Sequence, residues 1–388
     1  MIIGVVMIRR LVLAAAALVL IACPAAAQIE TQARQAYIID VKTGTVLLDK
    51  NSDELMPPSS MSKMMTAHML FEKLQKGEVK LTDEFPVSER AWRMQGSKMF
   101  VPLNGRVKVE DLIRGIVIQS GNDACIVVAE ALAGSEEAFA EQMTKRAREL
   151  GLTKSVFKNA SGWPHPDHVS TARELALLAK HTLETFPDYY KYYSELNFTF
   201  NGIKQGNRNP LLYKQLGADG LKTGHTEAGG YGLTASVKRG DRRIIMVVNG
   251  IMLPSSPAGL KARAQETEGL IEWAFREFEN YNLFKSGDAV QTAGVWLGDA
   301  KSVPLVAGDD LVVTLPRKAR QGMKVTAVYQ EPIPAPIQKG QKVGKLVITA
   351  PGVETKELPL IAADSVNQLG AAGRITAAVS YLIFGAQK

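Results

Sequence analysis

The stretch PPSSMSKMM, residues 57–65, places a serine and a lysine at the start of a predicted helix. Two prolines, then serine, then a helical pattern from Ser60 to Gly77 put Ser60 where the helix begins. Residues three apart share a helix face, so the Ser60 hydroxyl and the Lys63 amine are expected to meet. A lysine can activate a serine when burial or a neighbouring cation lowers its pKa. Alone, S-x-x-K is a weak signal, because Ser155–Lys158 also matches it and an N-capping serine beside an exposed lysine is the simpler interpretation.

Two further polar triplets follow along the chain. In Ser120-Gly121-Asn122 a hydroxyl and an amide flank a turn, where they could relay a proton and hold a substrate amide; the same residues are also common in ordinary turns. In Lys222-Thr223-Gly224 the lysine could anchor a carboxylate, the threonine could donate to it, and the glycine lets a substrate backbone approach a strand. This triplet is not unique, since Lys42-Thr43-Gly44 repeats it in the expected turn of a hairpin.

The order of the three motifs is more specific than any one of them. Ser60-x-x-Lys63, Ser120-x-Asn122 and Lys222-Thr223-Gly224 follow one another with separations of 60 and 102 residues. In this order the chain resembles the penicillin-recognising serine enzymes, and among them the serine D-alanyl-D-alanine carboxypeptidases, which are low-molecular-mass penicillin-binding proteins. The resemblance covers nearly all of the mature chain and includes the stretches Ala36–Asp40, Ser62–Thr66, Gly121–Ala124, Ser170–Arg173 and Asp219–Thr226.

This resemblance implies a catalytic group of four residues. Ser60 would be the acylated nucleophile and Lys63 its general base. Ser120 would relay a proton to the leaving group, and Lys222 would help to set the electrostatics of the cluster.

The resemblance also implies a set of substrate-binding residues. Asn122 would hold the peptide amide, while Lys222 and Thr223 would bind the terminal carboxylate. Gly224 and His225 would contact the substrate from the same protein strand as Lys222. The backbone amides of Ser60 and His225 would form the oxyanion hole. Arg263 matches an arginine near the carboxylate site of the family, although a surface pair with Glu266 explains it equally well.

The implied activity is removal of the terminal D-alanine from peptidoglycan stem pentapeptides through an acyl-enzyme, as part of peptidoglycan biosynthesis and the control of cell shape. Stem peptides and acylating β-lactam antibiotics are the expected partners, with no cofactor and no metal. A class A β-lactamase needs a glutamate for deacylation, and Glu195 in YSELN (193–197) is two residues late for E-x-x-L-N. A D,D-endopeptidase or transpeptidase on the same machinery and a non-catalytic wall-binding protein stay open as alternatives.

Other residues that attract attention have simpler explanations. His165 and His168 lie in a proline-rich loop and fall short of the three protein ligands that a catalytic zinc site requires, so a structural loop near the rim of the site is expected. Cys125 is expected to be a small buried hydrophobe.

The beginning of the chain resembles a secretory signal peptide. Arg9 and Arg10 precede an uncharged run from Leu11 to Ala27 that ends in three alanines, so cleavage after residue 27 is expected. An uncleaved membrane helix and lipidation of Cys23, in a lipoprotein-like LIAC box, are the alternatives, and Met7 is an alternative start. Cleavage leaves Cys125 as the single cysteine, which excludes an internal disulfide.

Composition excludes several broad classes of protein. With 46% hydrophobic and 22% charged residues over 388 positions, the chain is neither mainly disordered nor a disulfide scaffold. Loss of Arg9 and Arg10 lowers the formal charge from +7 to +5. The basic residues form no run of five or six, so nucleic acid is not an expected partner.

Between its ends the chain has two regions with different sequence patterns. Helical and strand patterns, beginning with a hairpin at 37–48, indicate an α/β or α+β domain; Ser170 is the predicted N-cap of a helix over 171–183. The resemblance makes this domain, 28–285, a penicillin-binding or β-lactamase-like one with helices on a mainly antiparallel sheet. Short β segments separated by turns and prolines predict a small all-β domain over 286–362. The expected fold class is therefore α+β with a C-terminal all-β domain.

The last segment, 363–388, is predicted to be an amphipathic helix that lies on a membrane surface. Its apolar residues fall near one helical face: Val366, Leu369, Ile375, Val379, Leu382 and Ile383. A terminal helix packed on its own domain is the alternative. Together with the signal peptide, this segment predicts an exported protein held peripherally at the periplasmic face of the bacterial inner membrane.

Overall fold

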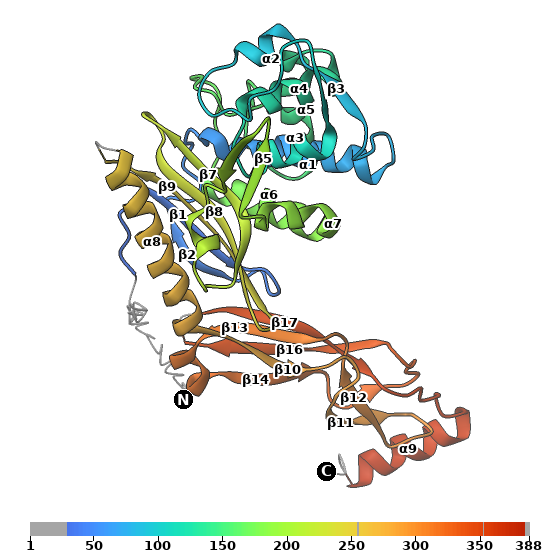
Figure 1. The fold of residues 1–388 in the computed structure, drawn as a ribbon. Coiled ribbons are helices and arrows are strands. Elements are labelled where there is room, and N and C mark those ends of the chain that lie inside the picture. Colours follow the sequence, from blue (N-terminus) through green and yellow to red (C-terminus); the bar gives the residue numbers. More distant parts are fainter. Residues whose placement is uncertain (1–28, 254–255, 352, 385–388) are drawn as a thin grey trace, which may run out of the picture.

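The structure is a computed structural model that describes residues 29–253, 256–351 and 353–384. The expected signal peptide, with Cys23 and the two possible starts, lies outside the described residues. An N-terminal part made of a sheet and helices is followed by a C-terminal part of strands, with one helix at its far end (Figure 1).

The longest of the described helices is α8, and the other helical segments are shorter. The α-helices are α1 (Lys63–Gln75), α2 (Glu89–Arg93), α3 (Val109–Val117), α4 (Asn122–Ala133), α5 (Glu136–Glu149), α6 (Ala172–Thr185), α7 (Pro187–Tyr190), α8 (Ser256–Glu277) and α9 (Ala371–Phe384). The 3₁₀ segments are η1 (Ser59–Ser62), η2 (Lys191–Ser194), η3 (Pro210–Tyr213) and η4 (Arg317–Gly322).

The strands fall into a first group before α8 and a second group after it. The first group is β1 (Gln35–Asp40), β2 (Val46–Lys50), β3 (Glu84–Pro86), β4 (Arg106–Lys108), β5 (Asn197–Phe200), β6 (Ile203–Gly206), β7 (Ala218–Thr226), β8 (Gly230–Arg239) and β9 (Arg242–Ile251). The second group is β10 (Phe278–Phe284), β11 (Ala289–Trp296), β12 (Ser302–Ala307), β13 (Leu311–Pro316), β14 (Lys324–Tyr329), β15 (Ile333–Pro334), β16 (Lys342–Ala350) and β17 (Val353–Ala362).

An antiparallel sheet of five strands, in the order β2-β1-β9-β8-β7, organises the first part. Strand β9 is apolar along most of its length because both of its faces are covered. Ile245 and Val247 join the core under the helices, whereas Ile244, Met246 and Val248 join the core under α8. This split follows the period of two along a strand. The predicted α+β class and the predicted hairpin are confirmed.

Strand β7 lies at the edge of this sheet, next to the helical segments (Figure 1). Helix α1 is buried along most of its length in the core that the helices share with one face of the sheet. A helix with little exposed surface is expected at the centre of a fold rather than on its outside. The segment that begins with PPSSMSKMM therefore lies in the middle of the first part.

The N-cap of α6 differs from the prediction. Thr171, not Ser170, accepts a hydrogen bond from the Glu174 backbone amide. Thr171 and Glu174 have the spacing of a capping box, which favours Thr171 over its neighbour. The Ser170 hydroxyl instead pairs with that of Ser155 at 2.8 Å.

The second part has its own hydrophobic core. A six-stranded sheet, in the order β14-β16-β17-β12-β11-β15, packs with the two-stranded sheet of β10 and β13 around that core. The predicted C-terminal β domain is confirmed. Strand β10 pairs with β13, so the expected boundary between residues 285 and 286 falls just after a strand of this domain.

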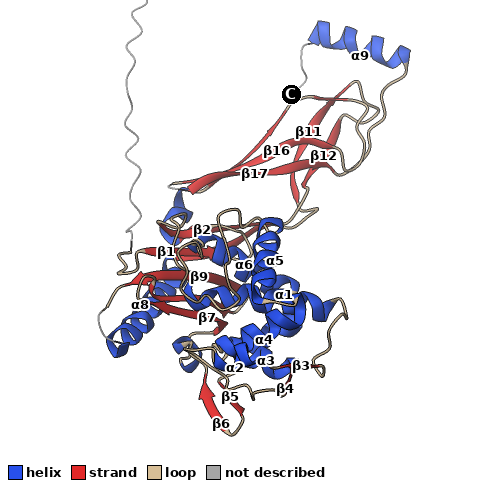
Figure 2. Ribbon diagram, turned by 90° about the horizontal axis from the view of Figure 1, so that it is seen from above, coloured by secondary structure: helices blue, strands red, loops and turns tan. Residues whose placement is uncertain are grey.

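Helix α9 begins later than expected. Val366 is buried in the β domain, where it bridges to Ile337, so the expected helix start near residue 363 is wrong. The helix itself projects from the end of the β domain that lies farthest from the first sheet (Figures 1 and 2). In the part of the chain that the structure describes, no helix is both long and apolar enough to cross a bilayer.

Candidate active site

The structure brings Ser60 and Lys63 together at the junction of η1 and α1. The Lys63 Nζ lies 3.1 Å from the Ser60 Oγ. Two further oxygens surround the amine, the Asn122 Oδ1 at 2.7 Å and the Ser161 carbonyl at 2.6 Å. Ser60 is only half-buried, whereas Lys63 is fully buried, so the serine faces the cleft and the lysine lies behind it.

Burial lowers the pKa of both lysines in the site. It lowers the pKa of Lys63 to about 8, because the charged amine loses its hydration, although the Asp123 carboxylate opposes the shift. The pKa of Lys222 is lowered well below its ordinary value, first by burial and then by the charge of Lys63. An amine that ionises near neutral pH is suited to accept a proton.

Ser120 connects the second and third motifs. It occupies the turn between α3 and α4 with a φ of +61°, a left-handed conformation that is uncommon outside glycine. Its hydroxyl accepts a hydrogen bond from the Lys222 Nζ at 2.9 Å. Asn122, the first residue of α4, accepts from Lys63 and donates through Nδ2 to the Gln95 carbonyl at 2.8 Å. The three motifs thus meet in one network.

Gly224 allows β7 to lie against the segment that carries Ser60. A Cβ at this position would lie 2.9 Å from the Pro58 carbonyl oxygen and 3.2 Å from the Ser59 Cβ. The sequence predicts that Gly224 gives room to a substrate backbone; the structure shows that its missing side chain gives room to the Pro58–Ser59 segment of the protein itself. Thr223 is buried beside it, and His225, which follows, is exposed at the cleft.

Arg263 lies buried in α8 and does not form the surface pair that was the alternative explanation. Glu266 accepts instead from Thr31 and from the Gln32 amide. The Nε of Arg263 has no hydrogen-bond partner among the described residues, and its guanidinium lies 5.9 Å from the ring of Tyr231. Burial lowers the pKa of Arg263 to about 10. A buried cation with a free donor is suited to hold an anionic group.

Three groups of the site were missed by the sequence analysis. Arg208, which donates to the Ser97 hydroxyl at 2.6 Å, is a further cation whose charge acts on Lys63, Lys222 and Arg263. The Asp123 carboxylate accepts from the backbone amides of Met99, Phe100 and Val101 and so fixes the segment beside Asn122. Its place after the S-x-N motif was the available signal.

The third missed group is the loop that supplies the Ser161 carbonyl. Asn159 Oδ1 accepts from the backbone amides of Ser161, Gly162 and Trp163, which is a local turn motif that the sequence could have revealed. The buried His168 then ties the loop to α1, because its Nε2 lies 2.8 Å from the Ser62 Oγ. The loop therefore has a fixed position against Lys63.

The residues set aside in the sequence have structural roles. His168 pairs with Ser62, and no group of three or more His, Cys, Asp or Glu side chains in residues 29–253, 256–351 and 353–384 is placed to hold a metal ion. Cys125 is buried, and burial raises the pKa of its thiol to about 12. Glu195 forms an ion pair with Arg114 at 2.8 Å and is not among the residues that line the cleft.

The cleft itself has a volume of about 460 Å³. Ser60 and Asn122 line it, together with His225 and Thr226 from the end of β7. A half-buried serine beside a buried lysine, a second lysine on an edge strand and two further cations nearby, Arg208 and Arg263, are typical of the serine enzymes of the S-x-x-K class.

Comparison with known proteins identifies the family within this class. The chain belongs to the D-alanyl-D-alanine carboxypeptidase family, whose model matches residues 22–252. The model of the C-terminal domain of penicillin-binding protein 5 matches residues 278–368.

Named relatives cover most of the chain. D-alanyl-D-alanine carboxypeptidase DacC of Escherichia coli (strain K12) is 39% identical over 88% of this chain and 86% of its own length. DacF of Bacillus subtilis (strain 168) is 35% identical over 87% of each. Among solved structures, penicillin-binding protein 5 of Haemophilus influenzae matches with a TM-score of 0.75 and 35% identity over 88% of this chain and 99% of that one.

Proposed function

We propose that this protein is a serine-type D-alanyl-D-alanine carboxypeptidase that removes the terminal D-alanine of peptidoglycan stem pentapeptides through an acyl-enzyme on Ser60. The arrangement around the Lys63 amine is the observation that carries the proposal. A neutral amine has two hydrogens, which the Asn122 Oδ1 and the Ser161 carbonyl accept at 2.7 and 2.6 Å. Its lone pair is then left for the Ser60 hydroxyl at 3.1 Å.

In the first half of the reaction, Ser60 attacks the carbonyl between the two D-alanines. Its proton passes to Lys63, and the Ser60–carbonyl bond forms while the peptide bond breaks. The departing amine takes this proton from Lys63 by way of the Ser120 hydroxyl, which Lys222 holds at 2.9 Å, so Lys63 is neutral again. The backbone amides of Ser60 and His225 stabilise the negative oxygen of the tetrahedral intermediate.

In the second half, water replaces the amine. Lys63 takes a proton from the water as the water attacks the ester, and it returns this proton to the Ser60 oxygen as the ester bond breaks. Penicillins enter the same route as far as the acyl-enzyme, because their ring amide occupies the place of the D-Ala-D-Ala bond.

The substrate lies along the free edge of β7. Lys222, Thr223 and Arg263 bind its terminal carboxylate, and the remaining Nδ2 hydrogen of Asn122 holds the peptide amide. The Arg263 Nε is buried and has no hydrogen-bond partner within the described part of the chain, which supports a role in binding the carboxylate. Gly224 keeps β7 close enough to Ser60 for one substrate to contact both.

We also propose that the protein works on the periplasmic side of the inner membrane. The N-terminal segment would direct export, and α9 would hold the β domain to the membrane surface. The exposed fractions of Ile375 and Val379, 66% and 48%, support this role, because the two side chains lie four residues apart on one helix face and are left in water.

The test is release of D-alanine from a defined pentapeptide. Ser60→Ala and Lys63→Ala should both lose release and labelling by fluorescent penicillin. Lys158→Ala, the exposed lysine of the second S-x-x-K sequence, is the matched control and should keep both. Retained release by Ser60→Ala would contradict the mechanism.

A further inference from the structure

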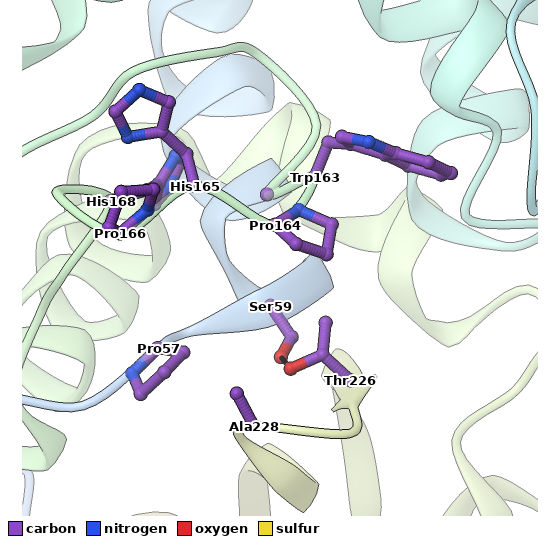
Figure 3. A pocket seen from close by; sticks show the side chains of 10 residues that line it. Pro57, Ser59, Trp163, Pro164, His165, Pro166, His168, Thr226 and Ala228 are labelled. Atoms are coloured by element: carbon purple, nitrogen blue, oxygen red, sulfur yellow. Dashed lines mark hydrogen bonds between the residues drawn. The ribbon is translucent and has the colours of Figure 1, made fainter.

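The Ser161 carbonyl, which accepts from the Lys63 amine at 2.6 Å, belongs to a loop that has a hollow on one side. This hollow, of about 280 Å³, is lined by Trp163 and Pro164 of the loop and by Ser59 of η1 (Figure 3). Atoms that border a hollow lack packing partners on that side. Contacts on the other sides of the loop must therefore fix the position of the carbonyl.

Ala160, the residue before Ser161, is fully buried and is held by two side chains. Its carbonyl accepts from the Thr66 hydroxyl at 2.6 Å, and its amide donates to the Glu136 carboxylate at 3.1 Å. Thr66 lies three residues after Lys63 in α1 and so on the same helix face. Both polar backbone groups of Ala160 are thus fixed, one residue away from the carbonyl that meets the amine.

Glu136 is unusual among the carboxylates at this end of α5 because it is buried. Its side chain is only 8% exposed and pairs with the Arg90 guanidinium at 2.7 Å. The neighbouring Glu137 pairs with the same guanidinium at 2.8 Å while it stays 66% exposed. A glutamate can therefore reach Arg90 without burial, which is costly for a charge unless it gains hydrogen bonds. The contact that Glu136 gains by its burial is the charge-assisted bond from the Ala160 amide.

We propose that Glu136 is a positioning residue for the general base. Together with Thr66 it fixes Ala160, and it thereby holds the Ser161 carbonyl where the Lys63 amine donates to it. The inference rests on the proposed function, since Lys63 acts as a base only if Ser60 is the nucleophile. A displaced carbonyl would let the amine turn its lone pair away from Ser60, and a misplacement of about 1 Å can cost up to 100-fold in rate.

The charge of Glu136 supplies a signal that a merely structural role would not give. Its carboxylate favours the protonated amine and so raises the pKa of Lys63, against the larger lowering by burial. Glutamine can still accept from the Ala160 amide but carries no charge, so Glu136→Gln separates the two effects. The other titratable or charged groups around Lys63 stay in place in this variant: Asp123 and Cys125 in α4, Lys222 in β7, Arg208 between β6 and η3, and His168 in the loop.

The first experiment follows acylation of the full-length protein by benzylpenicillin in stopped flow between pH 6 and 9. Glu136→Ala should lower the acylation rate constant about tenfold and leave the dissociation constant of the noncovalent complex unchanged. Glu136→Gln should recover most of the rate and shift the midpoint of the pH profile to lower pH. Glu137→Gln is the matched control and should keep both the rate and the midpoint. A normal rate in Glu136→Ala, or the parent midpoint in Glu136→Gln, would overturn the proposal.

The second experiment tests the same contact from α1 and does not depend on the folding of Glu136→Ala. Thr66→Val removes the hydroxyl that holds the Ala160 carbonyl and should lower the acylation rate constant several-fold, whereas Thr66→Ser keeps the hydroxyl and should keep the rate. Equal rates in the two variants would contradict the positioning role. If the parent protein were not acylated on Ser60 at all, the proposed function itself would fail.

Discussion

The charged form of Lys63 is unfavourable in the folded protein because its amine is removed from water. Its amine is fully buried among neutral oxygens, and its pKa is lowered to about 8 as a result. The unprotonated amine is the form that can accept the Ser60 proton. We therefore expect the second-order rate constant for acylation by benzylpenicillin to rise about tenfold per pH unit from pH 6 toward 8, and to level off above it. Stopped-flow measurement across this range checks the prediction, and a flat profile would show that another base acts.

His168 ties the pH dependence of stability to the loop beside the site. Its folded pKa of about 4 lies below the ordinary 6.5, because burial disfavours the charged ring. Between these values the unfolded chain binds a proton that the folded chain does not, so the free energy of unfolding falls as the pH drops from 7 to 5. The contribution of His168 to that fall is about 2 kcal/mol.

His168→Gln tests this contribution, because glutamine can keep a hydrogen bond to Ser62 but does not titrate. Urea unfolding at pH 7 and at pH 5 should show a fall that is about 2 kcal/mol smaller in the variant than in the parent protein. The same fall in both proteins would mean that His168 is not the group that titrates.

For single residues, the sequence predicted the contact within one helical turn and missed contacts between segments far apart in the chain. Ser60 and Lys63 share a helix face, so their meeting followed from their spacing. The Ser161 carbonyl lies 98 residues from Lys63 in the chain, and a backbone oxygen has no residue type to mark it. Arg208 lies in an Asn-Arg-Asn sequence without any pattern that separates it from other surface arginines.

Among the elements, the contact between β7 and η1 is the most sensitive. A methyl group at residue 224 must push the strand away from the Pro58 carbonyl, 2.9 Å away. Gly224→Ala should lower the acylation rate at least tenfold and the free energy of unfolding by about 1–3 kcal/mol. Gly269→Ala is the control, because a Cβ there meets no atom within 4 Å in the middle of α8, and it should stabilise by about 0.5–1 kcal/mol. Normal acylation by Gly224→Ala would contradict this account of the strand.

The terminal helix gives a second prediction at the scale of elements. Because Val366 belongs to the core of the β domain, truncation after Gly370 removes α9 and leaves that core intact. The truncated protein should leave the membrane fraction and keep its activity, and Ile375→Glu with Val379→Glu should release it likewise. Continued sedimentation of the truncated protein would contradict anchoring by α9 and would implicate lipid on Cys23 or an uncleaved N-terminal helix.

The sequence predicted that the C-terminal segment contains a helix, but it did not predict where α9 begins. Val366 and Leu369 have the spacing of a helical face, but Val366 is 2% exposed because it fills the end of the β core. Spacing alone cannot distinguish a residue that begins a helix from one that closes the preceding domain. Thr171 and Ser170 pose the same problem at the start of α6, where capping geometry decides between two adjacent hydroxyls.

For the whole molecule, α1 and β7, which carry site residues, and α9 lie at opposite ends with the strands of the β domain between them (Figure 2). A helix fixed on a membrane would therefore hold the cleft away from its surface. The two parts also touch, since Thr43 and Thr314 share a hydrogen bond and the Lys356 Nζ donates to the Thr45 Oγ1 at 3.3 Å. The second K-T-G sequence thus lies at a junction between domains, which no pattern within the triplet could indicate. The order of the three motifs, by contrast, predicted the class of fold, and the residues of the three motifs lie together in it.

The central claim is that one acyl group passes through Ser60 while the protein releases D-alanine. The most direct measurement is acid quenching during turnover of a pentapeptide, followed by digestion and mass spectrometry. We predict an acyl group that lacks one D-alanine on the peptide containing Ser60, and none in Ser60→Ala. Release of D-alanine without this adduct, or an adduct on Ser120 instead, would contradict the account.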